Sequence, residues 1–123
     1  MAIEYLIEKK DEFLSVTTFG FDEDIEEVIN YGKAVYEAAI SNNSTKILCD
    51  ERNLIYKISE IDTIKVAENA SHFAPKLKKL AIVYDKKFTN DAELFETIAI
   101  NRGLTVRFFC DYQKAIDWLL SSI

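Results

Sequence analysis

The chain has 123 residues and a formal net charge of −6, from 21 acidic and 15 basic side chains. This length suits one domain with one core, so we expect a single domain over residues 1–123. The acidic balance argues against a nucleic-acid partner, because phosphate binding requires a clustered positive surface. Two cysteines are typical of reduced thiols buried in a cytoplasmic protein. The sequence shows no signal peptide and no apolar run of the roughly 20 residues that a membrane span needs, so an integral membrane protein is not expected.

The first part of the chain predicts a β-hairpin followed by a helix. Residues 3–8 (IEYLIE) and 12–19 (EFLSVTTF) are rich in strand-forming residues and flank a short turn. A helix is predicted to open at Asp22, with acidic residues in its first turn opposing the helix dipole. Its apolar residues recur at helical spacing: Ile25, Val28, Ile29, Gly32, Val35, Tyr36, Ala39 and Ile40.

Three short apolar runs follow, and each stops at an aspartate. They are KILCD (residues 46–50), AIVYD (81–85) and LTVRFFCD (104–111). Runs with so little alternation are typical of strands buried on both faces, as in a parallel sheet covered by helices.

Helical segments are predicted between and after these strands. The first spans about residues 59–73, and the second spans about 90–102. Asn90 and Glu93 match a capping box at the start of the second helix, and Gly103 is placed to cap its end. The chain closes with DYQKAIDWLL, whose alanine, isoleucine, tryptophan and leucine side chains form an apolar face.

The predicted order is therefore ββαβαβαβα, an α/β fold with a mixed, mostly parallel sheet. Alternating strands and helices imply right-handed crossovers. Asp50, Asp85 and Asp111 then fall at the carboxyl edge of the sheet, where ligands of open α/β sheets usually bind.

These three aspartates have two interpretations. Carboxylates at one edge could hold magnesium beside a phosphate, which would suit a metal-dependent phosphate-binding protein or a small hydrolytic enzyme. Turn and cap roles explain the same residues without chemistry, and Asp111 directly precedes the last helix as an N-cap would. No glycine-rich phosphate loop accompanies them, and His72 is the only histidine. We therefore expect no metal ligands, no cofactor and no catalytic residues, and keep the enzyme as the alternative.

The element order and the ending FFCDYQKAIDWLL resemble the STAS domain, and in particular single-domain anti-sigma-factor antagonists. The resemblance covers essentially the whole chain. In that family an aspartate after the third strand precedes a stretch that is phosphorylated on serine. Asp50 matches the aspartate, and Ser59 within KISEI (residues 57–61) falls on a serine of the stretch. Ile58 and Ile61 depart from the pattern, where aspartate and glycine are expected.

The resemblance implies a non-catalytic regulatory domain that engages a protein partner or a small ligand at the carboxyl edge. Ser59 is the phosphorylation candidate, although its hydroxyl also suits a helix N-cap. The apolar stretch NLIYKI (residues 53–58) could cover the core, line a groove or support a homodimer. A carrier of apolar ligands or lipids is a further alternative. The candidate binding edge comprises Asp50, Glu51, Arg52, Asn53, Asp85 and Asp111.

Overall fold

The computed structural model of the chain describes residues 2–122. Its strands are β1 (Ile3–Lys9), β2 (Leu14–Asp22), β3 (Lys46–Tyr56), β4 (Lys79–Val83) and β5 (Val106–Phe109). Its α-helices are α1 (Ile25–Ser41), α2 (Glu60–Ala70), α3 (Thr89–Asn101) and α4 (Tyr112–Leu120). Two 3-10 helices, η1 (Ser71–Lys76) and η2 (Lys86–Phe88), lie before β4 and α3.

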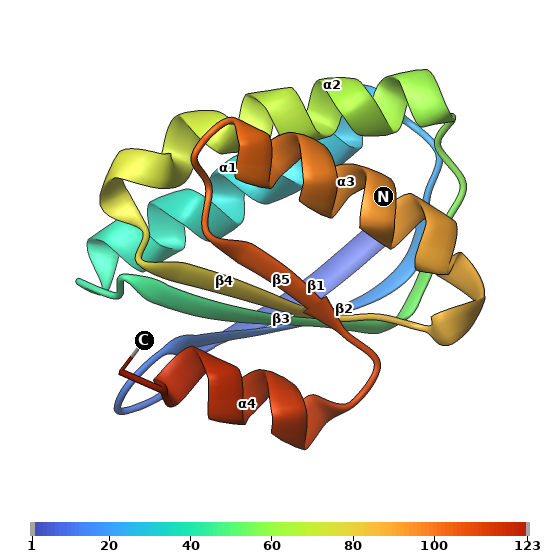
Figure 1. Ribbon diagram of the computed structural model, residues 1–123. Coiled ribbons are helices and arrows are strands. Elements are labelled where there is room, and N and C mark those ends of the chain that lie inside the picture. Colours follow the sequence, from blue (N-terminus) through green and yellow to red (C-terminus); the bar gives the residue numbers. More distant parts are fainter. Residues whose placement is uncertain (1, 123) are drawn as a thin grey trace.

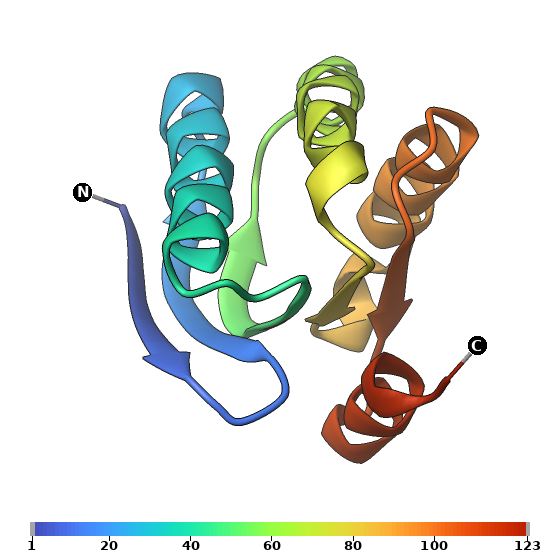
Figure 2. The same cartoon turned by 90° about the vertical axis from the view of Figure 1, so that its left-hand side faces the viewer.

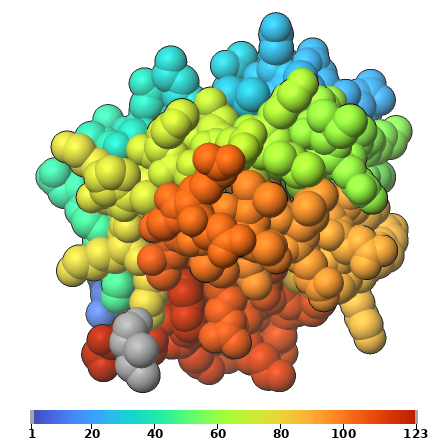
Figure 3. Space-filling view, turned by 45° about the horizontal axis from the view of Figure 1, so that its top comes forward, coloured from blue at the N-terminus to red at the C-terminus, as the bar shows by residue number. Residues whose placement is uncertain are grey.

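One sheet contains all five strands in the spatial order β1-β2-β3-β4-β5. Strand β1 pairs with β2 in the antiparallel sense, and every later pair is parallel. This confirms the predicted hairpin and the mixed, mostly parallel α/β sheet. Helices α1, α2 and α3 cover one face of the sheet, and α4 covers the other (Figure 1). Figure 3 shows the three helices side by side as the outer layer of their face.

The two faces of the sheet bury cores of different size. The larger core lies under α1, α2 and α3, and the smaller one contains Leu48, Ala81, Val83, Ala115 and Leu119 beneath α4. Helix α4 lies below the β4–β5 side of the sheet, so the outer face of the hairpin has no helix over it (Figure 2). Leu6 and Phe19 are accordingly 67% and 36% exposed.

Strand β3 is longer than the predicted strand that stops at Asp50. It continues to Tyr56 because β2 also extends past the end of β4, so that Phe19–Asp22 pair with Asn53–Tyr56. Most of the stretch NLIYKI is therefore strand and not connection. A strand partner that is distant in sequence supplies these hydrogen bonds, so the local pattern could not reveal them.

Helix boundaries follow the predictions, with two corrections. Asp22 closes β2, and it is Asp24 that caps α1 by accepting the Glu26 N–H. The predicted capping box at Asn90 is wrong, because η2 runs directly into α3 and Phe88 occupies the cap position without a side-chain hydrogen bond. The predicted cap after α3 is confirmed, since Gly103 has a φ of 97° and donates its N–H to Ile100.

We predict that alanine at Gly20 destabilises the fold more than alanine at Gly103. Both glycines have positive φ, where an L side chain is strained by about 1 kcal/mol. Only at Gly20 would the added Cβ also clash, at 2.0 Å from the carbonyl oxygen of Ala2, which accepts the Phe21 N–H. Chemical denaturation should show a loss of about 1 kcal/mol for Gly103→Ala and at least about twice that for Gly20→Ala. Equal losses would mean that the backbone at Ala2 moves away from the added methyl group at little cost in free energy.

Candidate functional site

A cavity of about 130 Å³ lies between the sheet and the three helices that cover its larger core. Strands β1–β5 and helices α1–α3 all contribute to its wall, which is mostly apolar. Its size is close to that of the roughly 150 Å³ protein cavity that holds benzene. Six aromatic side chains line it: Tyr31, Tyr36, Tyr56, Phe73, Phe95 and Phe108.

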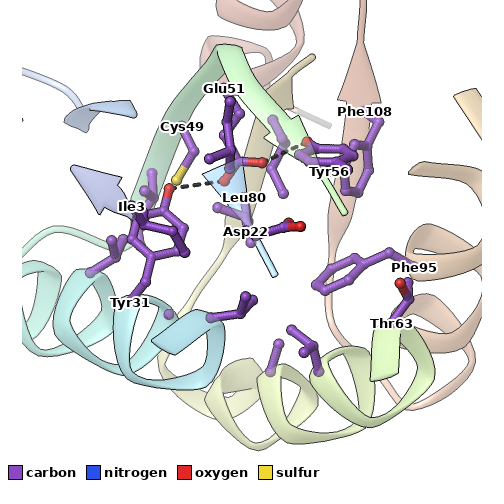
Figure 4. A pocket seen from close by; sticks show the side chains of 18 of the residues that line it. Ile3, Asp22, Tyr31, Cys49, Glu51, Tyr56, Thr63, Leu80, Phe95 and Phe108 are labelled. Carbon is purple, nitrogen blue, oxygen red and sulfur yellow. Dashed lines mark hydrogen bonds between the residues drawn. The ribbon is translucent and has the colours of Figure 1, made fainter. Parts of the chain in front are cut away.

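The carboxyl group of Glu51 faces this cavity from β3 (Figure 4). Its Oε1 accepts a hydrogen bond from the Tyr56 hydroxyl at 2.6 Å, and its Oε2 accepts one from the Tyr31 hydroxyl at 2.9 Å. The Tyr31 hydroxyl also lies 2.7 Å from that of Thr18 on β2. These contacts hold the buried Glu51 carboxyl group in a fixed position between helix α1 and strands β2 and β3.

Burial, and to a smaller extent the nearby Asp22 and Asp50 charges, raise the pKa of Glu51, which has a net value of about 7. The two tyrosine hydrogen bonds favour the ionised form and oppose this shift. Glu51 therefore changes its charge near neutral pH, whereas an exposed glutamate is ionised there.

A β-bulge explains why Leu54 and Tyr56 line the cavity together with Glu51. The register of β2 and β3 shifts between Thr17 and Phe19, where β3 contains one residue more than β2. The extra residue changes which side chains of β3 face the helices. As a result Glu51, Leu54 and Tyr56 all line the same cavity, although the first and the other two differ in parity along the strand.

A second carboxylate reaches the cavity from the end of β2. Asp22 is buried, and its Oδ1 accepts the backbone N–H groups of Lys57 and Ile58. Between residues 2 and 122 its Oδ2 accepts no hydrogen bond, and this oxygen is not fully buried, because every fully buried side-chain oxygen there has a partner. Figure 4 shows the side chain in the space between Glu51 and Phe95. Burial raises the pKa of Asp22, although the two backbone N–H groups lower it.

Asp91 on α3 completes the acidic lining of the cavity. Its charge also raises the pKa of Asp22, so the two carboxyl groups lie within electrostatic reach of each other. Within residues 2–122 the cavity wall contains three acidic side chains, Asp22, Glu51 and Asp91, and no lysine or arginine. The cavity is thus apolar in most of its wall and acidic where it is polar.

Three of the predicted edge residues come together on the α4 side of the sheet. Arg52 forms a bidentate pair with Asp50, with N–O distances of 2.7 Å and 2.9 Å. The Arg52 guanidinium group also lies 5.2 Å from the centre of the Tyr112 ring. The Asp50 hydrogen bond, and to a smaller extent the charge of Asp111, raise the pKa of Arg52. Asp111 caps α4 by accepting the Lys114 N–H, as predicted.

The remaining predicted residues lie elsewhere. Asp85 caps η2, and Asn53 is exposed on β3. Ser59 is exposed at the start of α2, where its hydroxyl accepts the Asp62 N–H at 3.1 Å, which confirms the predicted N-cap. Glu51 faces the interior. The predicted edge therefore divides into an α4-side surface, separate caps and a buried carboxyl group.

The structure gives the metal-site alternative no support from the described residues. Between residues 2 and 122, no group of three or more His, Cys, Asp or Glu side chains could hold a metal ion. Cys49 is buried as expected, but the buried-thiol prediction is wrong for Cys110, which is exposed after β5. None of the helices within these residues is long and apolar enough to cross a membrane.

Several residues of the cavity escaped sequence analysis. Tyr31, Tyr56, Asp22 and Asp91 come from four different elements, and no local spacing connects them. The one available signal was Gly32, a residue without a side chain in the middle of an otherwise regular apolar helix face. A Cβ atom at Gly32 would meet only Phe73 within 4 Å, at 4.0 Å, so the glycine borders the open part of the core.

Comparison with known proteins shows the fold. No family model matches the sequence, and no curated protein matches it. An uncharacterised protein of the DUF3478 family from Shewanella loihica PV-4, described as having a SpoIIAA-like fold, aligns with a TM-score of 0.59 and 20% identity over 96% of this chain and 94% of its own. An anti-sigma factor antagonist from Mycobacterium paratuberculosis aligns with a TM-score of 0.65 and 14% identity over 97% and 95% of the two chains. The expected STAS-like α/β fold is confirmed.

We predict that Glu51 makes the protein less stable as pH rises from about 4.5 to 7. Over this interval the unfolded state releases the Glu51 proton, while the folded state retains it. The ionisation of Glu51 should therefore lower the unfolding free energy by up to about 3 kcal/mol, with the full loss reached above pH 7. In Glu51→Gln this loss should be absent.

Urea denaturation of both proteins at several pH values from 4 to 8 measures this effect. Asp22 and all other titrating groups are common to the two proteins, so the difference between their curves isolates Glu51. Parallel curves would show that Glu51 titrates in the folded protein as it does in the unfolded chain.

Proposed function

We propose that this chain is a non-catalytic regulatory domain that binds a small, mainly apolar ligand in the cavity beneath α1, α2 and α3. The observation that carries the proposal is the cavity of about 130 Å³ with the Glu51 carboxyl group held in its wall. An apolar pocket with a few fixed polar groups is the usual form of a small-molecule site, in which the polar groups orient the ligand.

The energetics of Glu51 support this proposal. Burying a carboxyl group costs free energy unless hydrogen bonds compensate, and an apolar side chain at the same position would avoid the cost. Two tyrosines from two elements are engaged in holding this group. An arrangement that weakens the fold and places a hydrogen-bonding group against an open space is explained by a ligand that uses it.

The location of the cavity also fits a regulatory role. Asp22, Ile58, Thr63 and Asp91 border it at the ends of β2 and β3 and the starts of α2 and α3, which is the carboxyl edge of the sheet. One protein with the same fold is described as an anti-sigma factor antagonist. By analogy with that protein, we infer that the bound or empty state of the cavity is read by another protein.

The second candidate function is binding of a protein partner at the outer carboxyl edge, controlled by Ser59. The specific observation in its favour is the exposed Ser59 hydroxyl at the N-terminus of α2, where the helix dipole favours a phosphate. Glu60 and Asp62 lie in the same turn and oppose an added negative charge. The Asp50–Arg52 pair over Tyr112 offers a second polar surface on the other side of the sheet.

We predict that Gly32→Leu abolishes binding of a neutral one-ring probe, benzyl alcohol, whereas Gly32→Ala retains it. Gly32 lines the cavity, and a Cβ atom there would meet only the edge of Phe73, at 4.0 Å. The leucine side chain should occupy the volume that the probe needs. Replacing a mid-helix glycine by alanine should also raise the unfolding free energy by about 0.5–1 kcal/mol.

Isothermal titration with benzyl alcohol measures the first effect, and urea denaturation measures the second. If Gly32→Leu folds and binds the probe as well as the native chain does, the site lies outside this cavity. Absence of binding to the native chain would contradict the proposed ligand-binding function itself.

For the second candidate, we expect a partner captured from the source cells by the native chain and Ser59→Ala to be lost with Ser59→Glu. The glutamate carries negative charge at the start of α2, whereas alanine removes only the hydroxyl cap. Quantitative mass spectrometry of the three captured samples makes the comparison. Equal capture by all three would exclude Ser59 as a switch, and thermal unfolding of each variant controls for the loss of the cap.

A further inference from the structure

We propose that the ligand of this cavity is a protonated primary amine carried on a small apolar body, with the ammonium group held between Glu51 and Asp22. This inference rests on the ligand-binding function proposed above and specifies its chemistry. It follows from the charge of the cavity wall, from the hydrogen-bonding capacity of its carboxyl groups and from the size of the remaining space.

The charge of the cavity wall favours a cationic ligand. Three acidic side chains from β2, β3 and α3 line the cavity, and within residues 2–122 no lysine or arginine joins them. A carboxylate or phosphate ligand would meet only like charge in a medium of low dielectric constant, where repulsion is strong. A cationic ligand would relieve the repulsion between these carboxyl groups, because opposite charge favours their ionised forms.

The hydrogen-bonding capacity of the carboxyl groups favours a ligand that donates hydrogen bonds. Each oxygen of Glu51 accepts one tyrosine hydrogen bond, and a carboxylate oxygen has a second lone pair to offer. Asp22 uses Oδ1 for two backbone N–H groups, and its Oδ2 has no partner among the described residues. An ammonium group supplies three donors and no acceptor, so it can donate to these oxygens without adding an unpaired acceptor of its own.

The rest of the cavity determines the size and polarity of the part of the ligand that carries the ammonium group. Apart from Thr63 and Cys49, the side chains that surround the carboxyl groups are aromatic or aliphatic. The rings of Tyr31, Tyr56 and Phe95 line the same space, and aromatic rings attract cations through their faces. A volume of about 130 Å³ admits a single ring or a short alkyl chain and excludes a long acyl chain.

The test uses three one-ring probes of matched size and different charge: benzylamine, benzyl alcohol and benzoate. Isothermal titration of the intact chain at pH 8 and constant ionic strength measures each dissociation constant, with Glu51 ionised above its pKa of about 7. We expect benzylamine to bind at least about ten-fold more tightly than benzyl alcohol, as hydrogen bonds to charged groups are the stronger ones. Benzoate should bind most weakly.

Two variants then locate the preference. Glu51→Gln should remove most of the advantage of benzylamine over benzyl alcohol, measured as the ratio of the two dissociation constants in the same variant. Glu37→Gln makes the same change of net charge at an exposed position of α1 and should leave the preference intact. Asp22→Asn repeats the test if Glu51→Gln does not fold, and thermal unfolding of each variant establishes that point.

The outcomes separate the inference from the function on which it rests. Equal affinity for benzylamine and benzyl alcohol, or tighter binding of benzoate, would overturn the amine assignment and leave a ligand-binding cavity. A benzylamine preference that survives in Glu51→Gln and in Asp22→Asn would overturn it too. If none of the three probes binds, both the amine assignment and the proposed function fail.

Discussion

The handedness of strand connections determines the arrangement of this molecule. Strands β2 to β5 join the sheet in the order of the chain, and every new strand is added on the same side. Right-handed crossovers then place α1, α2 and α3 on one face. Helix α4 follows the last strand, is not a crossover, and packs on the opposite face (Figure 2). One face is thus covered by three helices, and the cavity lies between them and the sheet.

The chemistry of the cavity depends on one local irregularity in this regular plan. A bulge in β3 directs Glu51, Leu54 and Tyr56 to the same side of the sheet. The Tyr56 hydroxyl can therefore donate a hydrogen bond to the Glu51 carboxyl group, and the Tyr31 hydroxyl on α1 donates a second one. Helix α2 contributes Thr63 to the cavity wall, and the exposed Ser59 caps its start. The same helix therefore borders both the cavity and the outer carboxyl edge.

Sequence analysis was correct for most local features, although the capping box at Asn90 and the helix start at Asp22 were wrong. The hairpin, the helix order and the caps at Ser59 and Asp111 follow from residue type and spacing over a few positions, and the structure confirms them. The extension of β3 beyond Asp50 depends on pairing with β2, which is distant in the chain. Its bulge breaks the alternation beyond Glu51, so the orientation of Tyr56 could not be inferred from that of Cys49. Binding at the carboxyl edge stays a prediction.

The cavity beside Glu51 has a consequence for the response of the protein to pressure. A folded protein that encloses a void occupies more volume than its close-packed atoms require, and unfolding lets water fill that void. The volume change of unfolding scales with such voids and amounts to tens of mL/mol in typical proteins. Hydrostatic pressure should therefore act on this domain chiefly through the layer between the sheet and α1, α2 and α3. The layer beneath α4, whose buried core is the smaller of the two, should contribute less to this volume change.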